Sequence, residues 1–244
     1  MNVFARYESW AESLEVEYLI KDAKRGCQFP TTTSTGPGFN KVFDQLTQDP
    51  LMTAIYDESV RNDGLWLSDA EVPAALKLYR YYKEVRNSLV HSDGLANRQL
   101  ANTSKDAQQA IITFTAGGRH RTGPIPVLAE QDPIAINFLT VRYTAALLRA
   151  LVFTIDARIM VSTIGKKELL GRWKSVYGDA PMHVKPAKLH KELWFHAKVS
   201  TALSIPVPID SDGPVPKGGR RKWPEASRDA FSQFAVANDM ILRI

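Results

Sequence analysis

The sequence predicts a mainly α-helical protein, because apolar residues recur at the three- and four-residue spacing of helices over long segments. Strand-like character is confined to one short region, about residues 110–129. The chain has 244 residues, of which 44% are hydrophobic, so it can bury a sizeable core. These observations favour a helical bundle with a small β-hairpin insertion and a C-terminal helical extension.

The N-terminal part contains two predicted helices separated by a loop. The apolar stripe of the first helix consists of Phe4, Tyr7, Ala11, Leu14 and Tyr18. Residues 28–38 are rich in proline, threonine and glycine, which predicts a loop. The second helix is expected from Phe39 to about Glu58, and Pro50 can kink it.

The third predicted helix carries both capping signals and a regular apolar face. Ser68 and Glu71 have the spacing of a capping box, in which each side chain accepts from the backbone N–H of the other. Gly94 marks the end of the helix. The apolar positions between these ends are Leu78, Tyr82, Val85 and Leu89.

Between the third and fourth helices the sequence predicts a hairpin. Residues 110–115 and 125–128 have the composition of short strands, and a glycine-rich turn lies between them. Arg119 and Arg121 make this turn basic, so it is either a phosphate-binding loop or an ordinary solvated turn.

The fourth predicted helix spans about residues 133 to 159 and is the most regular of all. Its stripe is typical of the seam of a helical bundle or of a dimer. The stripe consists of Ile134, Phe138, Val141, Ala145, Leu148, Val152, Ile155 and Ile159. We therefore assign residues 1–161 to a helical bundle with a hairpin insertion.

Residues 162–244 are expected to form a basic helical extension packed on the bundle. Helices are predicted around residues 169–176, 187–202 and 230–241. Residues 151–244 contain 15 Lys and Arg against 9 Asp and Glu, a net charge of +6, whereas residues 1–150 contain 16 against 17, a net charge of −1. The positive charge therefore lies in the C-terminal part and favours an anionic partner such as RNA.

The basic run before the last helix is the sharpest feature of this extension. It comprises Lys217, Arg220, Arg221, Lys222 and the neighbouring Trp223. Such cations can neutralise phosphates while the indole ring stacks on a base. The run can equally be a solvated charge cluster in which Trp223 anchors the final helix.

Composition also predicts a cytoplasmic protein without a metal or cofactor. The only cysteine is Cys27, which excludes an internal disulfide. The N-terminal segment is rich in glutamate, unlike a signal peptide, and Arg142 and Arg149 interrupt the most apolar helix, so no membrane association is expected. The spacing of His183, His190 and His196 is not that of a zinc site.

The strongest functional pattern lies in the last turns of the third helix. Arg86, Asn87 and His91 combine a cation, an amide and an imidazole, which suit attack on a phosphodiester. Arginine can hold two phosphate oxygens, and histidine titrates near neutral pH and can act as acid or base. Asn87 would orient a phosphate oxygen or the imidazole. One histidine serves poorly as both acid and base, so we expect a homodimer with two facing copies.

The motif Arg86-Asn87-x-x-x-His91, late in a helix of an all-helical chain, resembles that of the HEPN superfamily (higher eukaryotes and prokaryotes nucleotide-binding domain). The resemblance covers the chain up to about residue 161. It implies a metal-independent ribonuclease of a toxin, phage-defence or RNA-processing system that works as a dimer. A neutralising antitoxin or another regulatory protein would then be a partner.

Two other interpretations are open. First, positively charged arginine and histidine side chains near the C-terminal end of a helix stabilise it by their interaction with the helix dipole, without any catalytic role. Helical bundles serve many unrelated functions, so the chain can also be a non-catalytic module that binds a nucleotide, RNA or a partner protein.

Overall fold

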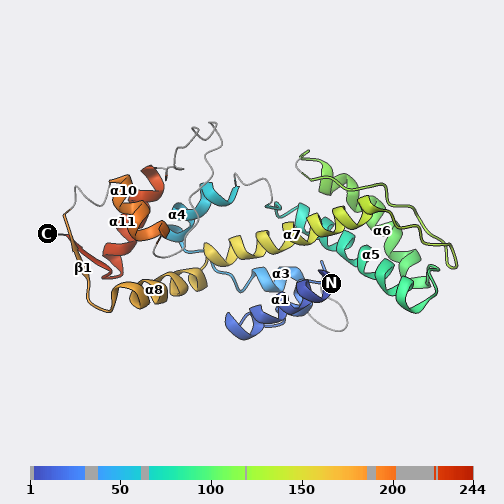
Figure 1. Ribbon diagram of the computed structural model, residues 1–244, viewed down its shortest axis with the longest axis horizontal. Helices are drawn as coiled ribbons and strands as arrows, with labels where there is room; N and C mark the ends of the chain where they lie inside the picture. The colour runs from blue at the N-terminus through green and yellow to red at the C-terminus, as the bar shows by residue number, and fades with distance from the viewer. Residues whose placement is uncertain are drawn as a thin grey trace. The chain divides into compact units, whose positions relative to one another are not determined.

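The computed structural model is mainly α-helical, as predicted (Figure 1). It describes residues 3–30, 38–61, 66–118, 120–185, 191–201, 223 and 225–243. The chain divides into two compact units, of which the first comprises Met1–Gln45 and Leu65–Ile155 and the second Leu46–Gly64 and Asp156–Ile244. The predicted boundary at residue 161 differs from this division, since the predicted N-terminal bundle included residues 46–64.

The first unit contains most of the predicted bundle. Its helices are α1 (Val3–Glu17), α2 (Ala23–Gly26), α3 (Phe39–Phe43), α5 (Glu71–His91), α6 (Arg98–Thr115) and the larger part of α7 (Phe138–Met160). Helix α1 buries the predicted face, and Tyr7 at its centre donates a hydrogen bond to the carbonyl oxygen of Cys27 at 2.7 Å. The ring of Tyr7 lies 5.0 Å from that of Tyr79, so α1 packs on α5.

Helix α5 begins as the sequence predicts. The backbone N–H of Ser68 donates to Glu71 Oε2 at 2.7 Å, and the N–H of Glu71 donates to Ser68 Oγ at 3.4 Å. Leu78, Tyr82 and Val85 of the predicted stripe are buried. Leu89, nearer the C-terminal end, is exposed.

The predicted hairpin at residues 110–129 is wrong. Residues 110–115 form the end of α6, where Ala110 and Phe114 are buried one turn apart on the same face. The β-branched run from Ile111 to Thr113 favours a strand locally, but packing of the α6 face decides the structure. Residues 120–137 form an irregular segment without a strand.

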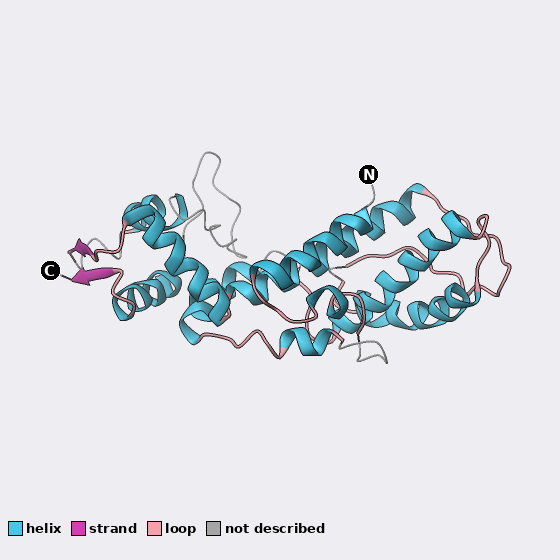
Figure 2. Ribbon diagram, turned by 90° about the horizontal axis from the view of Figure 1, so that it is seen from below, coloured by secondary structure: helices cyan, strands magenta, loops and turns pink. Residues whose placement is uncertain are grey.

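The second unit contains short helices and a two-stranded sheet. Its elements are α4 (Pro50–Arg61), α8 (Thr163–Tyr177), β1 (Met182–Val184), α10 (Glu192–Phe195), the π-helical η1 (His196–Thr201), α11 (Glu225–Ala237) and β2 (Ile241–Arg243). The strands pair in parallel, with Met182 opposite Ile241 (Figure 2). The helix predicted at 187–202 is α10 and η1 instead, and residues 186–190 and 202 lie outside the described part.

The continuous helix predicted from Phe39 to Glu58 is also wrong, because the chain forms two helices there. Asp49 caps α4, since its Oδ1 accepts hydrogen bonds from the N–H groups of Leu51 and Met52 at 3.0 and 3.1 Å. Pro50 is the first residue of α4, where its missing N–H is not needed. The proline therefore starts a helix instead of kinking one.

Two glycines of α8 allow a matched test of packing in the second unit. A Cβ at buried Gly165 would overlap the carbonyl oxygen of Met160, whereas one at Gly171 would meet open space. We expect Gly165→Ala to lower the free energy of unfolding by about 2 kcal/mol. Gly171→Ala should raise it by about 0.5–1 kcal/mol, because alanine favours the helix. Urea denaturation measures both, and equal effects would contradict this packing.

Candidate functional site

The predicted motif lies in the last two turns of α5, which remain regularly helical. The N–H of Ser92 still donates to the carbonyl oxygen of Ser88 at 2.9 Å, so the helix does not unwind before its end. Arg86 and Asn87 are half-buried and His91 is exposed. Asn87 and His91 are one turn apart on the helix. Arg86 reaches Asn87, since its Nη1 lies 3.1 Å from Asn87 Oδ1, whereas Arg86 and His91 start about 140° apart around the helix.

The turn after His91 is held in place by backbone hydrogen bonds. Asp93 and Gly94 have positive φ values of 49° and 79°, which reverse the chain. The N–H of Ala96 then donates to the carbonyl oxygen of Asp132 at 2.8 Å, and that of Ile134 donates to the oxygen of Gly94 at 2.9 Å. The end of α5 is therefore fixed to the segment that precedes α7.

A buried carboxylate organises the inner side of the motif. Glu84 Oε1 lies 3.0 Å from Nη2 of Arg80 and 3.4 Å from Nε2 of Gln99, which comes from α6. Glu84 Oε2 lies 3.5 Å from Nδ2 of Asn87. An ionised carboxylate only accepts hydrogen bonds, so the amide nitrogen of Asn87 faces Glu84. We call Arg80, Glu84, Asn87 and Gln99 the Glu84 network.

The Glu84 network determines how Asn87 meets Arg86. With its nitrogen towards Glu84, Asn87 presents Oδ1 to Arg86, whose Nη1 donates to it at 3.1 Å. Asn87 thus contacts the guanidinium group of Arg86 on one side and Glu84 on the other. That Asn87 orients a phosphate oxygen or the imidazole stays a prediction.

The two arginines near Glu84 differ in their charge balance. Arg80 forms an ion pair with Glu84 and its guanidinium carbon lies 4.6 Å from the ring centre of Phe29. Arg86 forms no ion pair with any carboxylate in the described part of the chain. Its positive charge is therefore available to an anion.

Neither tyrosine of the neighbouring turns supplies a base. Burial raises the pKa of Tyr81 to about 12. Burial also raises the pKa of Tyr82, and the hydrogen bond with Thr122 lowers it by a smaller amount. Both phenols are neutral at physiological pH, so neither tyrosine is a base there.

The residues predicted to bind RNA are only partly described. Arg121 is exposed, and its neighbour Thr122 shares a 3.1 Å hydrogen bond with the hydroxyl of Tyr82, one helical turn before Arg86. The segment that carries Arg121 therefore lies against α5. Arg119, Lys217, Arg220, Arg221 and Lys222 lie outside the described residues.

Trp223 belongs to the core of the second unit. It is 2% exposed and its ring centre lies 5.0 Å from that of Phe195. The stacking of a base on this ring is thus excluded, and the alternative prediction that Trp223 serves as an anchor is confirmed.

Glu84 and Gln99 were not among the predicted site residues. Glu84 follows Arg80 at i,i+4 and precedes Asn87 at i,i+3, a spacing that places the three on one side of a helix. That signal was present in the sequence. Gln99 comes from the next helix, and only the packing of α6 on α5 brings it to Glu84.

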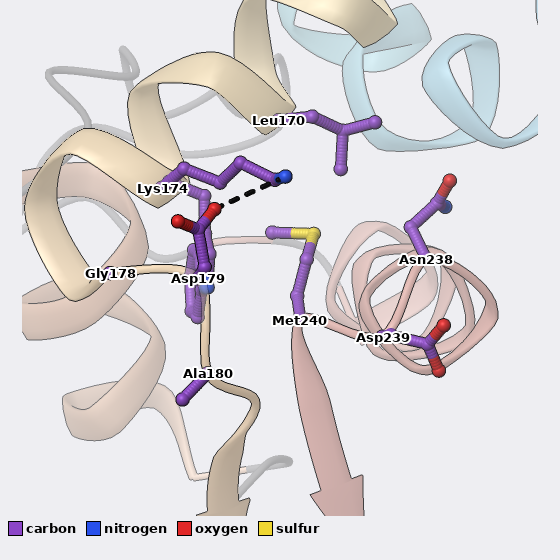
Figure 3. A pocket seen from close by; sticks show the side chains of 9 residues that line it. Leu170, Lys174, Gly178, Asp179, Ala180, Asn238, Asp239 and Met240 are labelled. Carbon is purple, nitrogen blue, oxygen red and sulfur yellow. Dashed lines mark ion pairs between the residues drawn. The ribbon is translucent and has the colours of Figure 1, made fainter.

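The second unit contains a pocket of about 230 Å³ between α8 and the turn that follows α11 (Figure 3). Lys174 Nζ and Asp179 Oδ1, both in its lining, form an ion pair at 3.2 Å. Both side chains are well exposed, and Trp173 and Met240 form an apolar floor. The paired charges leave no excess cation for a phosphate, so this pocket does not serve the predicted chemistry.

The Glu84 network should contribute to stability as well as to geometry. Both members of the Arg80–Glu84 pair are largely buried, so Glu84→Ala leaves a buried cation without its partner and should lower the free energy of unfolding by about 3 kcal/mol. Glu12→Ala is the control, because its ion pair with Lys24 is exposed and should contribute less than about 1 kcal/mol. Equal losses in urea denaturation would show that the network is not structural.

In the described part of the chain, no group of three or more His, Cys, Asp and Glu residues is placed to hold a metal ion. Comparison with protein-family models, with curated proteins and with solved structures found no match to this chain.

Proposed function

We propose that the protein is a metal-independent endoribonuclease of HEPN type. One observation carries the proposal: the last two turns of α5 hold both a cation and an exposed imidazole. The cation is Arg86, which has no carboxylate partner among the described residues. The Glu84 network positions the guanidinium group of Arg86, and the backbone hydrogen bonds after His91 fix the end of the helix that carries both residues. Such preorganisation is what catalysis by positioned charges needs.

The proposed reaction is an attack within the RNA strand. A neutral His91 removes the proton from a ribose 2′-OH, whose oxygen attacks the neighbouring phosphorus. The bond from phosphorus to O5′ breaks, and a protonated imidazole gives its proton to the leaving oxygen. The products are a 2′,3′-cyclic phosphate and a free 5′-OH, and no oxidant, water or metal enters the balance.

Arg86 stabilises the charge that develops on the phosphoryl oxygens. Its guanidinium group is planar and can face two oxygens at once. Asn87 keeps this group in place from the protein side. Arg86→Lys should therefore cost much of the activity even though the charge is retained.

The acid and the base are supplied by two copies of His91. A single imidazole would have to be neutral and protonated in the same step, so two chains related by a twofold axis solve the problem. We propose a homodimer in which the two motifs face each other. Arg121 and the positively charged C-terminal part would attract the RNA strand.

A toxin or phage-defence effector is the proposed biological setting, because uncontrolled cleavage of RNA harms the cell that makes it. A neutralising antitoxin or regulatory protein would then control the activity. We propose a cytoplasmic location, where RNA is available.

His91→Ala should lower the rate of RNA cleavage by a factor of about 10² to 10⁴, the usual contribution of a general acid or base. The assay uses total RNA and tRNA with the purified protein. Cleavage should persist in EDTA and leave 2′,3′-cyclic phosphate ends. His183→Ala is the matched control, since His183 is an exposed histidine of the second unit.

Cleavage that His91→Ala leaves unchanged would refute the proposed chemistry. Binding of RNA or a nucleotide without turnover, insensitive to Arg86→Ala, would instead support a non-catalytic binding module.

A further inference from the structure

The pocket of the second unit combines apolar side chains with charged ones (Figure 3). Leu170 of α8 and Met240 point towards the same space, and Trp173 also lines it. The volume of about 230 Å³ gives room for about six to eight non-hydrogen atoms, if each takes the roughly 30 Å³ of a water molecule in the liquid. The pocket therefore fits a small molecule with an apolar part.

Two helices end at this pocket. Helix α8 ends at Tyr177 and helix α11 at Ala237, and the residues that follow them, Gly178 and Asn238, are part of the lining. The C-terminal end of a helix carries a partial negative charge, because its last carbonyl groups have no donor within the helix. After α8 the chain cannot supply one donor, since Pro181 has no N–H for the carbonyl oxygen of Tyr177. Both helix ends therefore favour a cation in the pocket.

The side chains of the lining add a further negative charge. The lining contains one cation, Lys174, and two carboxylates, Asp179 and Asp239, which gives a net charge of −1. Lys174 and Asp179 neutralise each other, whereas Asp239 is exposed and has no ion pair among the described residues. Asn238 donates through Nδ2 to the carbonyl oxygen of Phe234 at 2.7 Å, so its Oδ1 remains an acceptor. The pocket thus has more acceptors than donors.

We propose that this pocket binds a small organic cation, namely a primary ammonium group on a short aliphatic chain. The ammonium group lies near Asp239 and Asn238 at the two helix ends, and the chain covers Leu170, Trp173 and Met240. An inorganic cation fits less well, because the apolar side chains offer it no oxygen ligand. The inference goes beyond the proposed function, since the pocket lies in the second unit and needs neither RNA nor the motif of α5.

Three probes of similar length separate the effect of charge from that of shape. They are pentylammonium, 1-pentanol and pentanoate, each added to the full chain with ¹³C-labelled methionine methyl groups and observed by NMR at low salt. The signal of Met240 should shift, and that of Met52, which is fully buried in α4, should not. We expect a Kd of about 1–10 mM for pentylammonium, binding of pentanol at least about tenfold weaker, and no binding of pentanoate.

Two variants of the lining should change this affinity in opposite directions. Lys174→Ala removes the competing cation and frees Asp179, so pentylammonium should bind about threefold to fivefold more tightly. Asp239→Asn removes a negative charge and should weaken binding by a similar factor. Lys167→Ala is the control, because Lys167 is an exposed lysine of the same helix that does not line the pocket. It should leave the affinity unchanged.

Three results would overturn the inference. The first is an unshifted Met240 signal at about 50 mM pentylammonium, well above the expected Kd. The second is equal binding of pentanol, which would show a merely apolar pocket. The third is weaker binding in Lys174→Ala, which would show that the lysine holds the ligand. The expected pattern in a protein that cleaves no RNA would support the inference and refute the ribonuclease alone.

Discussion

The buried carboxylate of Glu84 is the constraint on which the candidate site depends. It accepts hydrogen bonds from Arg80 and Asn87 of α5 and from Gln99 of α6. Glu84 therefore joins α5, which carries the motif, to α6. A buried charge is costly unless it is paired and fully hydrogen-bonded, and here each donor satisfies that demand. The same bonds orient Asn87 and thereby Arg86. Glu84 therefore serves both the packing of α6 on α5 and the geometry of the candidate site.

The site separates a fixed cation from an accessible imidazole. Arg86 is half-buried and held by Asn87, whereas His91 is exposed at the end of the helix and makes no hydrogen bond within the described part of the chain. A preorganised cation costs little reorganisation when charge develops on a phosphate. An exposed imidazole can meet both a substrate and a second copy of the site. This division of roles agrees with a reaction that is completed between two chains.

The sequence predicted those parts of the fold that local chemistry decides. The capping box of Ser68 and Glu71, the buried stripe through Val85 and the helical character of residues 138–160 follow from spacing alone. The errors have physical causes. The hairpin was predicted because Ile111 to Thr113 favour a strand locally, but the packing of α6 on α5 makes them helical. The continuous helix from Phe39 to Glu58 was predicted because a proline such as Pro50 can kink a helix without ending it, but Asp49 and Pro50 start a new helix. Of the candidate site, Arg86, Asn87 and His91 were chosen from their pattern, and their role stays a prediction. Gln99 was not, because its contact with Glu84 is tertiary.

In the proposed reaction, one cleavage site is built from two copies of Arg86 and His91. It is tested most directly by co-expressing the wild-type chain with His91→Ala at equal levels and measuring the RNA cleavage rate per total dimer. If both imidazoles act on one bond, mixed dimers are inactive and the rate falls to about a quarter of the wild-type value. A rate of about one half would show that each chain cleaves by itself and would contradict the account.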